Sequence, residues 1–114
     1  MALKMGTHQV GDVTVVTLDG HVVLGEETSS LREKMKALLD EGKKKIVLDM
    51  KNVTFIDSAG LGALVGVHHS AVTRGAHMRL ANLGAKFKEL LQITKLLTVF
   101  HVSDTEADAI QSLK

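Results

Sequence analysis

The 114-residue sequence contains no cysteine, tryptophan, tyrosine or proline, and only three phenylalanines. Without cysteine there can be no disulfides, no thiolate metal sites and no cysteine nucleophile. With so few aromatic rings, the chain has no platform on which the bases of RNA or single-stranded DNA could stack. The core must therefore be built from aliphatic side chains and methionine, and the absence of proline argues against a linker.

Strong net charge and long hydrophobic runs are also absent. The formal net charge of +1 predicts neither the basic surface of a nucleic-acid binder nor a polyacidic tail. The longest segment without a formal charge, Ser58 to Thr73, has 16 residues and includes three glycines and two histidines, so it is too short and too polar to span a bilayer. The N-terminal segment lacks the apolar stretch of a secretory signal. We therefore expect a cytoplasmic protein that binds neither nucleic acid nor a membrane.

The composition, 45% hydrophobic and 24% charged, is typical of a globular protein, and the length predicts a single domain over residues 1–114. Residues 7–24 are rich in β-branched side chains and predict strands. Turns are expected at Gly11-Asp12 and at Asp19-Gly20, which would make this region a hairpin or meander.

Helices and strands are then predicted to alternate. The first helix has apolar residues at helical spacing and ends at Gly42; it begins either with a capping box at Ser30 or with an acidic first turn at Glu26 and Glu27. Later strands are predicted at 46–48, 53–56, 78–81 and 98–100, with a turn at Lys51-Asn52 between the first two. Later helices are predicted at 61–72 and 84–91, and a final helix begins with a capping box at Ser103 to Glu106. This order predicts an α/β or α+β fold, with one mixed sheet and helices packed on it.

The most informative segment runs from Phe55 to Gly66, where a strand is predicted to pass into a helix. Asp57 is placed to cap that helix, and Ser58 would lie in its first turn, near the positive end of the helix dipole. Gly60 and Gly62 weaken a helix by about 1 kcal/mol each. They therefore serve either close contact with a partner or tight packing on the sheet.

Common catalytic and ligand-binding motifs do not fit this segment. A P-loop needs Gly-Lys-Ser/Thr, the dinucleotide fingerprint would need glycine at Val65, and a nucleophile elbow would need glycine at Ile56. No His–acid pair can be assigned to Ser58. His68 and His69 are adjacent on the predicted helix and point about 100° apart, so they cannot chelate one metal. We expect no catalytic residue, no metal and no cofactor.

The hexapeptide Asp57-Ser58-Ala59-Gly60-Leu61-Gly62 at a strand-to-helix junction resembles the anti-sigma factor antagonist family, the stand-alone STAS domains of bacteria. The similarity covers nearly the whole chain and implies the STAS fold. Other segments typical of the family are Gly11-Asp12-Val13, Asp19-Gly20, Ile46-Val47-Leu48-Asp49-Met50, and Leu91-Gln92-Ile93-Thr94-Lys95-Leu96 followed by Val99-Phe100.

The resemblance implies a non-enzymatic regulator of transcription. Such a protein binds an anti-sigma factor and thereby releases a sigma factor. The anti-sigma factor is commonly a serine kinase with a histidine-kinase-like ATPase fold, which would phosphorylate Ser58 and so end binding, and a PP2C-type phosphatase would restore it. The surface that binds the partner would comprise Asp57, Ser58, Ala59, Gly60, Leu61 and Gly62.

One segment departs from the family pattern. Many members carry Gly-Glu-Leu-Asp after the second strand, whereas this chain has Gly20-His21-Val22-Val23 and lacks that aspartate. Glu26 or Glu27 is a candidate to replace it. The departure keeps a second hypothesis open, in which the chain is a constitutive scaffold of a stressosome-like or other bacterial signalling complex and Ser58 mainly starts a helix.

Overall fold

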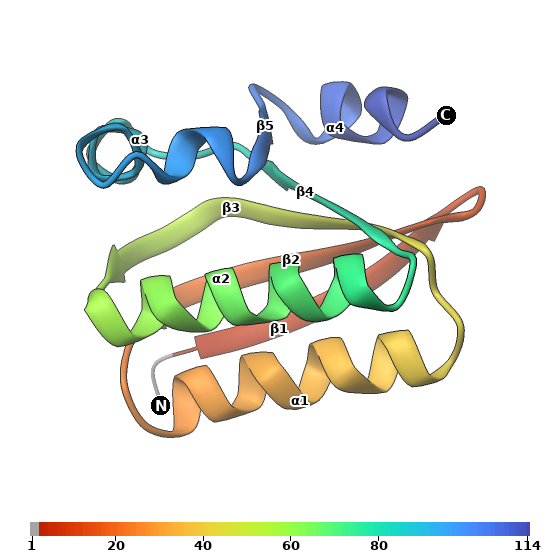
Figure 1. The fold of residues 1–114 in the computed structure, drawn as a ribbon, viewed down its shortest axis with the longest axis horizontal. Helices are drawn as coiled ribbons and strands as arrows, with labels where there is room; N and C mark the ends of the chain where they lie inside the picture. Colours follow the sequence, from red (N-terminus) through yellow and green to blue (C-terminus); the bar gives the residue numbers. More distant parts are fainter. Residues whose placement is uncertain (1–2) are drawn as a thin grey trace.

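A five-stranded mixed sheet forms the centre of the computed structural model, which describes residues 3–114 (Figure 1). The strands lie side by side in chain order, β1-β2-β3-β4-β5. Their bounds are β1 Leu3–Val10, β2 Val13–Val22, β3 Lys45–Ile56, β4 His77–Ala81 and β5 His101–Ser103. β1 is antiparallel to β2, and all later neighbours are parallel. The mixed sheet predicted from the sequence is confirmed.

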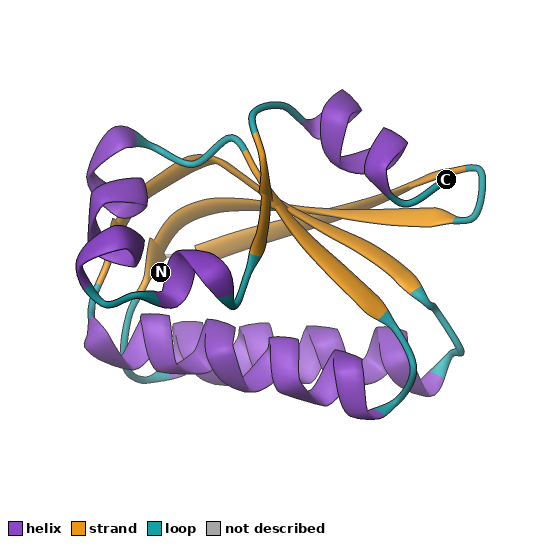
Figure 2. Cartoon of the chain, turned by 45° about the horizontal axis from the view of Figure 1, so that its top comes forward, coloured by secondary structure: helices purple, strands orange, loops and turns teal. Residues whose placement is uncertain are grey.

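Helices connect the parallel strands and cover both faces of the sheet. They are α1 Glu26–Asp40, α2 Ser58–Thr73, α3 Ala85–Ile93 and α4 Glu106–Ser112, with a short 3-10 helix, η1, at Leu96–Thr98. α1 and α2 lie side by side against one face, and α4 lies on the opposite face (Figure 2). α3 packs on the main core through Phe87 and Leu91.

Both faces of the middle of β3 are buried, as the apolar run Ile46-Val47-Leu48 predicts. Ile46 and Leu48 belong to the larger core beneath α1 and α2, and Val47 to a smaller core beneath α4. Because β3 is fixed between these two layers, the residues at its C-terminal end are presented at one end of the molecule.

The turns predicted at Asp19-Gly20 and Lys51-Asn52 are wrong, because β2 and β3 run without interruption through both positions. The pairing register between β2 and β3 shifts twice here, with β3 having an extra residue each time. These irregularities are β-bulges, which accommodate turn-forming residues by bending the strand. The positive φ of Gly20, 121°, fits such a place.

Three predicted boundaries also need correction. α1 begins after Gly25 with the acidic turn at Glu26 and Glu27, so the alternative capping box at Ser30 is wrong. α4 is capped by Thr105, whose hydroxyl accepts from the Asp108 amide, instead of Ser103. The strand predicted at 98–100 is absent, because this segment closes the turn of η1 and β5 starts only at residue 101.

Candidate functional site

Asp57 joins the end of β3 to the start of α2 and is the N-cap that the sequence predicts. Its Oδ1 accepts a hydrogen bond from the Gly60 amide at 2.7 Å. Its Oδ2 accepts another from the Leu24 amide at 3.1 Å, in the loop between β2 and α1. One carboxylate therefore caps the helix and also fixes the neighbouring loop against the helix start.

These hydrogen bonds stabilise the charged form of Asp57. The amide of Gly60, followed by that of Leu24, lowers the pKa of the Asp57 carboxyl below its usual value. The side chain is therefore an anion at neutral pH, directly before Ser58. A second negative charge at residue 58 would lie beside it.

Gly60 serves packing on the sheet. It is buried, and a Cβ at this position would overlap the carbonyl oxygen of Val22 at the end of β2. The Asp57 amide donates to that same carbonyl at 3.3 Å. Of the two roles that the sequence left open for Gly60, tight packing is the one this contact supports.

Gly62 and Ser58 lie on the outer side of α2. Both are exposed, and a Cβ at Gly62 would meet no atom of the described residues within 4 Å. Ala59 and Leu61 are half-buried, and Leu61 packs against the main core. The hexapeptide is therefore divided by function: Asp57, Gly60 and Leu61 hold the helix start in place, whereas Ser58 and Gly62 leave it open to another surface.

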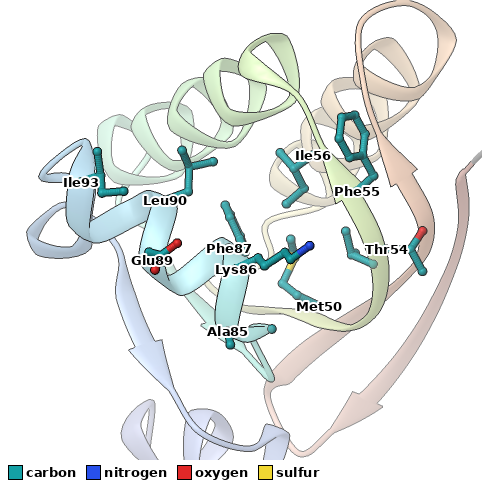
Figure 3. Close-up of a pocket in the computed structure, with 12 residues that line it drawn as sticks. Met50, Thr54, Phe55, Ile56, Ala85, Lys86, Phe87, Glu89, Leu90 and Ile93 are labelled. Carbon is teal, nitrogen blue, oxygen red and sulfur yellow. The ribbon is translucent and has the colours of Figure 1, made fainter.

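A groove next to this helix start was not predicted from the sequence (Figure 3). It has a volume of about 620 Å³ and lies between the second half of β3 and α3. Its walls are largely apolar, from Met50, Val53, Phe55 and Ile56 on β3 and from Phe87, Leu90 and Ile93 on α3. Phe55 and Ile93 in these walls are strongly exposed, which the sequence pattern did not reveal.

The acidic residues proposed to replace the missing family aspartate begin α1. Glu26 and Glu27 follow Leu24, the residue that Asp57 binds, by two and three positions. α1 and α2 start at the same end of the molecule (Figure 1). The structure thus brings the acidic first turn of α1 to the end of the molecule that presents Ser58.

Residues 3–114 contain no cluster of three histidine, aspartate or glutamate side chains that could hold a metal ion. His68 is half-buried on α2, and its ring packs edge-on against Phe100 at 5.4 Å between ring centroids, whereas His69 is exposed. Within the same residues, no helix has the length and apolar character that crossing a bilayer would need.

Comparison with known proteins agrees with this geometry. The sequence matches the STAS domain family over residues 4–109. It is 28% identical to the anti-sigma F factor antagonist of Paenibacillus polymyxa over an alignment of 119 positions. That alignment covers 100% of this chain and 96% of the relative. It is 31% identical over 81 residues to the anti-sigma-B factor antagonist of Bacillus subtilis. This second alignment covers 71% of this chain and 73% of the relative.

Solved structures show the same fold. A putative anti-sigma factor antagonist from Thermotoga maritima superposes with a TM-score of 0.87 at 24% identity and covers 95% of this chain and 92% of its own. The Bacillus cell fate determinant SpoIIAA, solved in its phosphorylated form, gives a TM-score of 0.74 at 19% identity, with coverage of 97% and 100%. The fold, the Asp57 junction and these relatives together lead to one conclusion: the chain is a STAS domain that belongs to the anti-sigma factor antagonist family.

Proposed function

We propose that this chain binds an anti-sigma factor through the start of α2, and that phosphorylation of Ser58 ends this binding. Relatives named as anti-sigma factor antagonists support the general role. Binding would sequester the anti-sigma factor and so free a sigma factor for transcription. The chain acts in this scheme as a regulator and catalyses no reaction itself.

The observation that carries the proposal is the free hydroxyl of Ser58. Ser58 is the first residue of α2, is exposed, and its side chain makes no hydrogen bond within residues 3–114. Asp57 already provides the cap, so the helix does not need this hydroxyl. A serine whose hydroxyl is not needed to cap the helix, and which lies at an accessible helix start, is well placed for modification.

A phosphate at Ser58 would change the surface and spare the fold. It adds about 1.5 to 2 negative charges, so the net charge of +1 would fall to about −1. Backbone amides in the first turn of α2 favour an anion there. A partner surface that fits a small neutral hydroxyl, however, would have to bury a dianion beside the Asp57 carboxylate. Moving the complex from almost fully bound to almost fully free needs about 5.5 kcal/mol of differential affinity.

The partner expected from this scheme is a serine kinase with a histidine-kinase-like ATPase fold, and a PP2C-type phosphatase would reverse the modification. Both expectations come from the family resemblance. The phosphorylated form of SpoIIAA supports this, because it is a protein of this fold that carries a phosphate. The acidic turn at Glu26 and Glu27, at the same end as Ser58, supports a role of these residues in placing the kinase.

A second candidate function is a constitutive scaffold in a stressosome-like or other signalling complex. Val23, which stands where many family members carry aspartate, favours it. In that case the Ser58 surface would bind its partners whether or not residue 58 is charged. The two functions therefore differ in one measurable property, the effect of charge at residue 58 on binding.

The test uses three baits in lysate of the source cells: wild type, Ser58→Glu and the matched control Ser70→Glu. Ser70 is also exposed on α2, near its other end. We expect wild type and Ser70→Glu to retrieve an ATPase-fold protein that Ser58→Glu does not retrieve, with the melting temperature of Ser58→Glu nearly unchanged. With purified partner and ATP, mass spectrometry should find phosphate on Ser58 of the wild type and none on Ser58→Ala.

Equal retrieval by all three baits would show that Ser58 does not control binding, and the scaffold function would replace the switch. A large loss of melting temperature in Ser58→Glu would show that the hydroxyl is structural.

A further inference from the structure

Three strongly exposed hydrophobic side chains lie at the groove or next to the Asp57 junction. Leu24 in the β2–α1 loop is 75% exposed, Ile93 at the end of α3 is 72% exposed, and Phe55 at the end of β3 is 56% exposed. Leu24 is tied to Asp57 through its amide, and the other two line the groove between β3 and α3. Single exposed apolar residues are ordinary, whereas several around a groove mark an interaction surface.

The groove wall ends two residues before Ser58 in the chain. Ile56 forms part of the groove wall and directly precedes Asp57 in the chain. Phe55 lies on its rim beside Ile56, as Figure 3 shows. A partner bound at Ser58 would therefore lie close to the groove. Burial of these apolar walls would add affinity that the small, polar surface at Ser58 and Gly62 cannot supply.

Charges on α3 define what kind of segment fits. Lys86 lies at the start of α3 and extends across the groove (Figure 3), and it forms no ion pair within residues 3–114. The first turn of α3 has no acidic residue, and Gly84 provides no side-chain cap. This end of the groove is therefore electropositive. Glu89, about one turn further along, is the one carboxylate among the lining residues.

We propose that the anti-sigma factor which binds at Ser58 also inserts an amphipathic helix into this groove. The apolar residues of that helix would pack on Ile56, Phe87 and Ile93, and one of its acidic residues would pair with Lys86. α3 has nine residues, about 13 Å at 1.5 Å per residue, which matches two to three turns of a docked helix. This inference rests on the proposed function and assigns the partner a second contact.

The experiment measures the affinity of the purified ATPase-fold partner, obtained with the wild-type bait, for four further variants. Ile93→Asp should weaken binding about tenfold or more, because it places a charge in the apolar groove. Lys86→Glu should weaken it several-fold, and Lys86→Arg should bind like the wild type. Val72→Asp is the matched control: Val72 is also 56% exposed, but it lies on α2 outside the groove. It should leave the affinity unchanged.

The outcomes separate this inference from the proposed function. If Ile93→Asp and Lys86→Glu bind like the wild type while Ser58→Glu does not bind, the groove is no docking site, and the switch at Ser58 stands. If the wild type binds no anti-sigma factor, both proposals fall. If the wild type is a dimer in gel filtration and Ile93→Asp is a monomer, a second copy of this chain covers the groove, and the assignment to the anti-sigma factor is overturned.

Discussion

Helix α2 is tied to the rest of the molecule at its C-terminal end by an ion pair and a hydrogen bond to its last turn. At its start, the Asp57 carboxylate and the packing of Gly60 hold the helix, and Ser58 and Gly62 stay exposed. At the C-terminal end, Arg74 Nη1 pairs with Asp40 Oδ1 of α1 at 2.8 Å. Asp40 also pairs with Lys36 at 2.9 Å, and Lys44 Nζ donates to the Arg74 carbonyl at 2.7 Å. Several elements therefore meet and bind one another at this end.

At the N-terminal end, the contacts that fix the helix all point inward. Asp57 binds the amides of Gly60 and Leu24, and Gly60 lies on the carbonyl of Val22. Ser58 and Gly62 face outward, and neither makes a comparable contact with residues 3–114. The polar groups at the C-terminal end of α2 thus stabilise the fold, while the N-terminal end leaves the Ser58 hydroxyl and the backbone at Gly62 accessible to a partner.

The sharpest test of this division compares two glycines one half-turn apart. Gly60→Ala should destabilise the fold by about 3 kcal/mol, because its Cβ would overlap the Val22 carbonyl, a backbone atom that cannot move easily. Gly62→Ala has open space and a helical position, so it should stabilise the fold by about 0.5 to 1 kcal/mol. Urea unfolding of both variants measures these changes. Equal effects of the two substitutions would show that the hexapeptide has no inner and outer side.

The next largest effect is expected at Asp57. Asp57→Ala removes both hydrogen bonds and should lower the melting temperature by about 5 °C. Asp57→Asn can still cap Gly60 but places an amide near the Leu24 N–H, so its loss should be smaller. Because the folded pKa of Asp57 is lowered, its contribution is present above the usual value of 3.8 and is lost as the pH falls below it. The stability difference between wild type and Asp57→Ala should therefore shrink in acid, and a constant difference would contradict the role of the charge.

The sequence was sufficient to predict the elements that local patterns define. The helix predicted at 61–72 and its cap at Asp57 depend on neighbouring residues and are confirmed. The buried strand at Ile46-Val47-Leu48 was predicted for the same reason. The turns at Asp19-Gly20 and Lys51-Asn52 were wrong because pairing between two long strands overrides local turn propensity, and the pattern of one strand does not reveal the bulges of its neighbour.

The functional surface was predictable only in part. The hexapeptide locates Ser58, but the different roles of Gly60 and Gly62 depend on the Val22 carbonyl, 38 positions before Gly60 in the chain. The groove depends on the contact of β3 with α3, which are separated by the whole of α2 and β4. Such features arise from tertiary packing and cannot be predicted from a local sequence pattern.

A smaller, pH-dependent effect is expected from His68, midway along α2. Its Nδ1 is buried without a hydrogen-bond partner within residues 3–114, and its ring contacts Phe100. Burial, with lesser contributions from Arg79 and His69, lowers the pKa of His68 below its usual value of 6.5. The unfolded chain therefore binds a proton more readily, so this contribution to stability is present above pH 6.5 and is lost as the pH falls below it.

The melting temperature of the wild type should accordingly fall between about pH 7.5 and about pH 5.5. His68→Phe keeps a ring against Phe100 and cannot titrate, so its fall should be shallower. His101, whose pKa burial also lowers, remains in both proteins and accounts for the residual slope. Identical slopes would show that His68 does not contribute, and that the middle of α2 responds to pH no more than its ends.

The smallest effect on stability is expected at the C-terminal end of α2. Arg74→Ala removes an exposed ion pair, while Asp40 keeps Lys36 and the bond from Lys44 to the backbone carbonyl of residue 74 survives. Exposed pairs contribute little and are screened by salt, so the melting temperature should change by less than about 3 °C, and by less still at high salt. Affinity for the anti-sigma factor should not change, because the ion pair lies at the opposite end of the helix from Ser58. If Arg74→Ala weakened partner binding as Ser58→Glu is expected to, the binding surface would extend along the whole helix, and the division between a structural end and an open end would be lost.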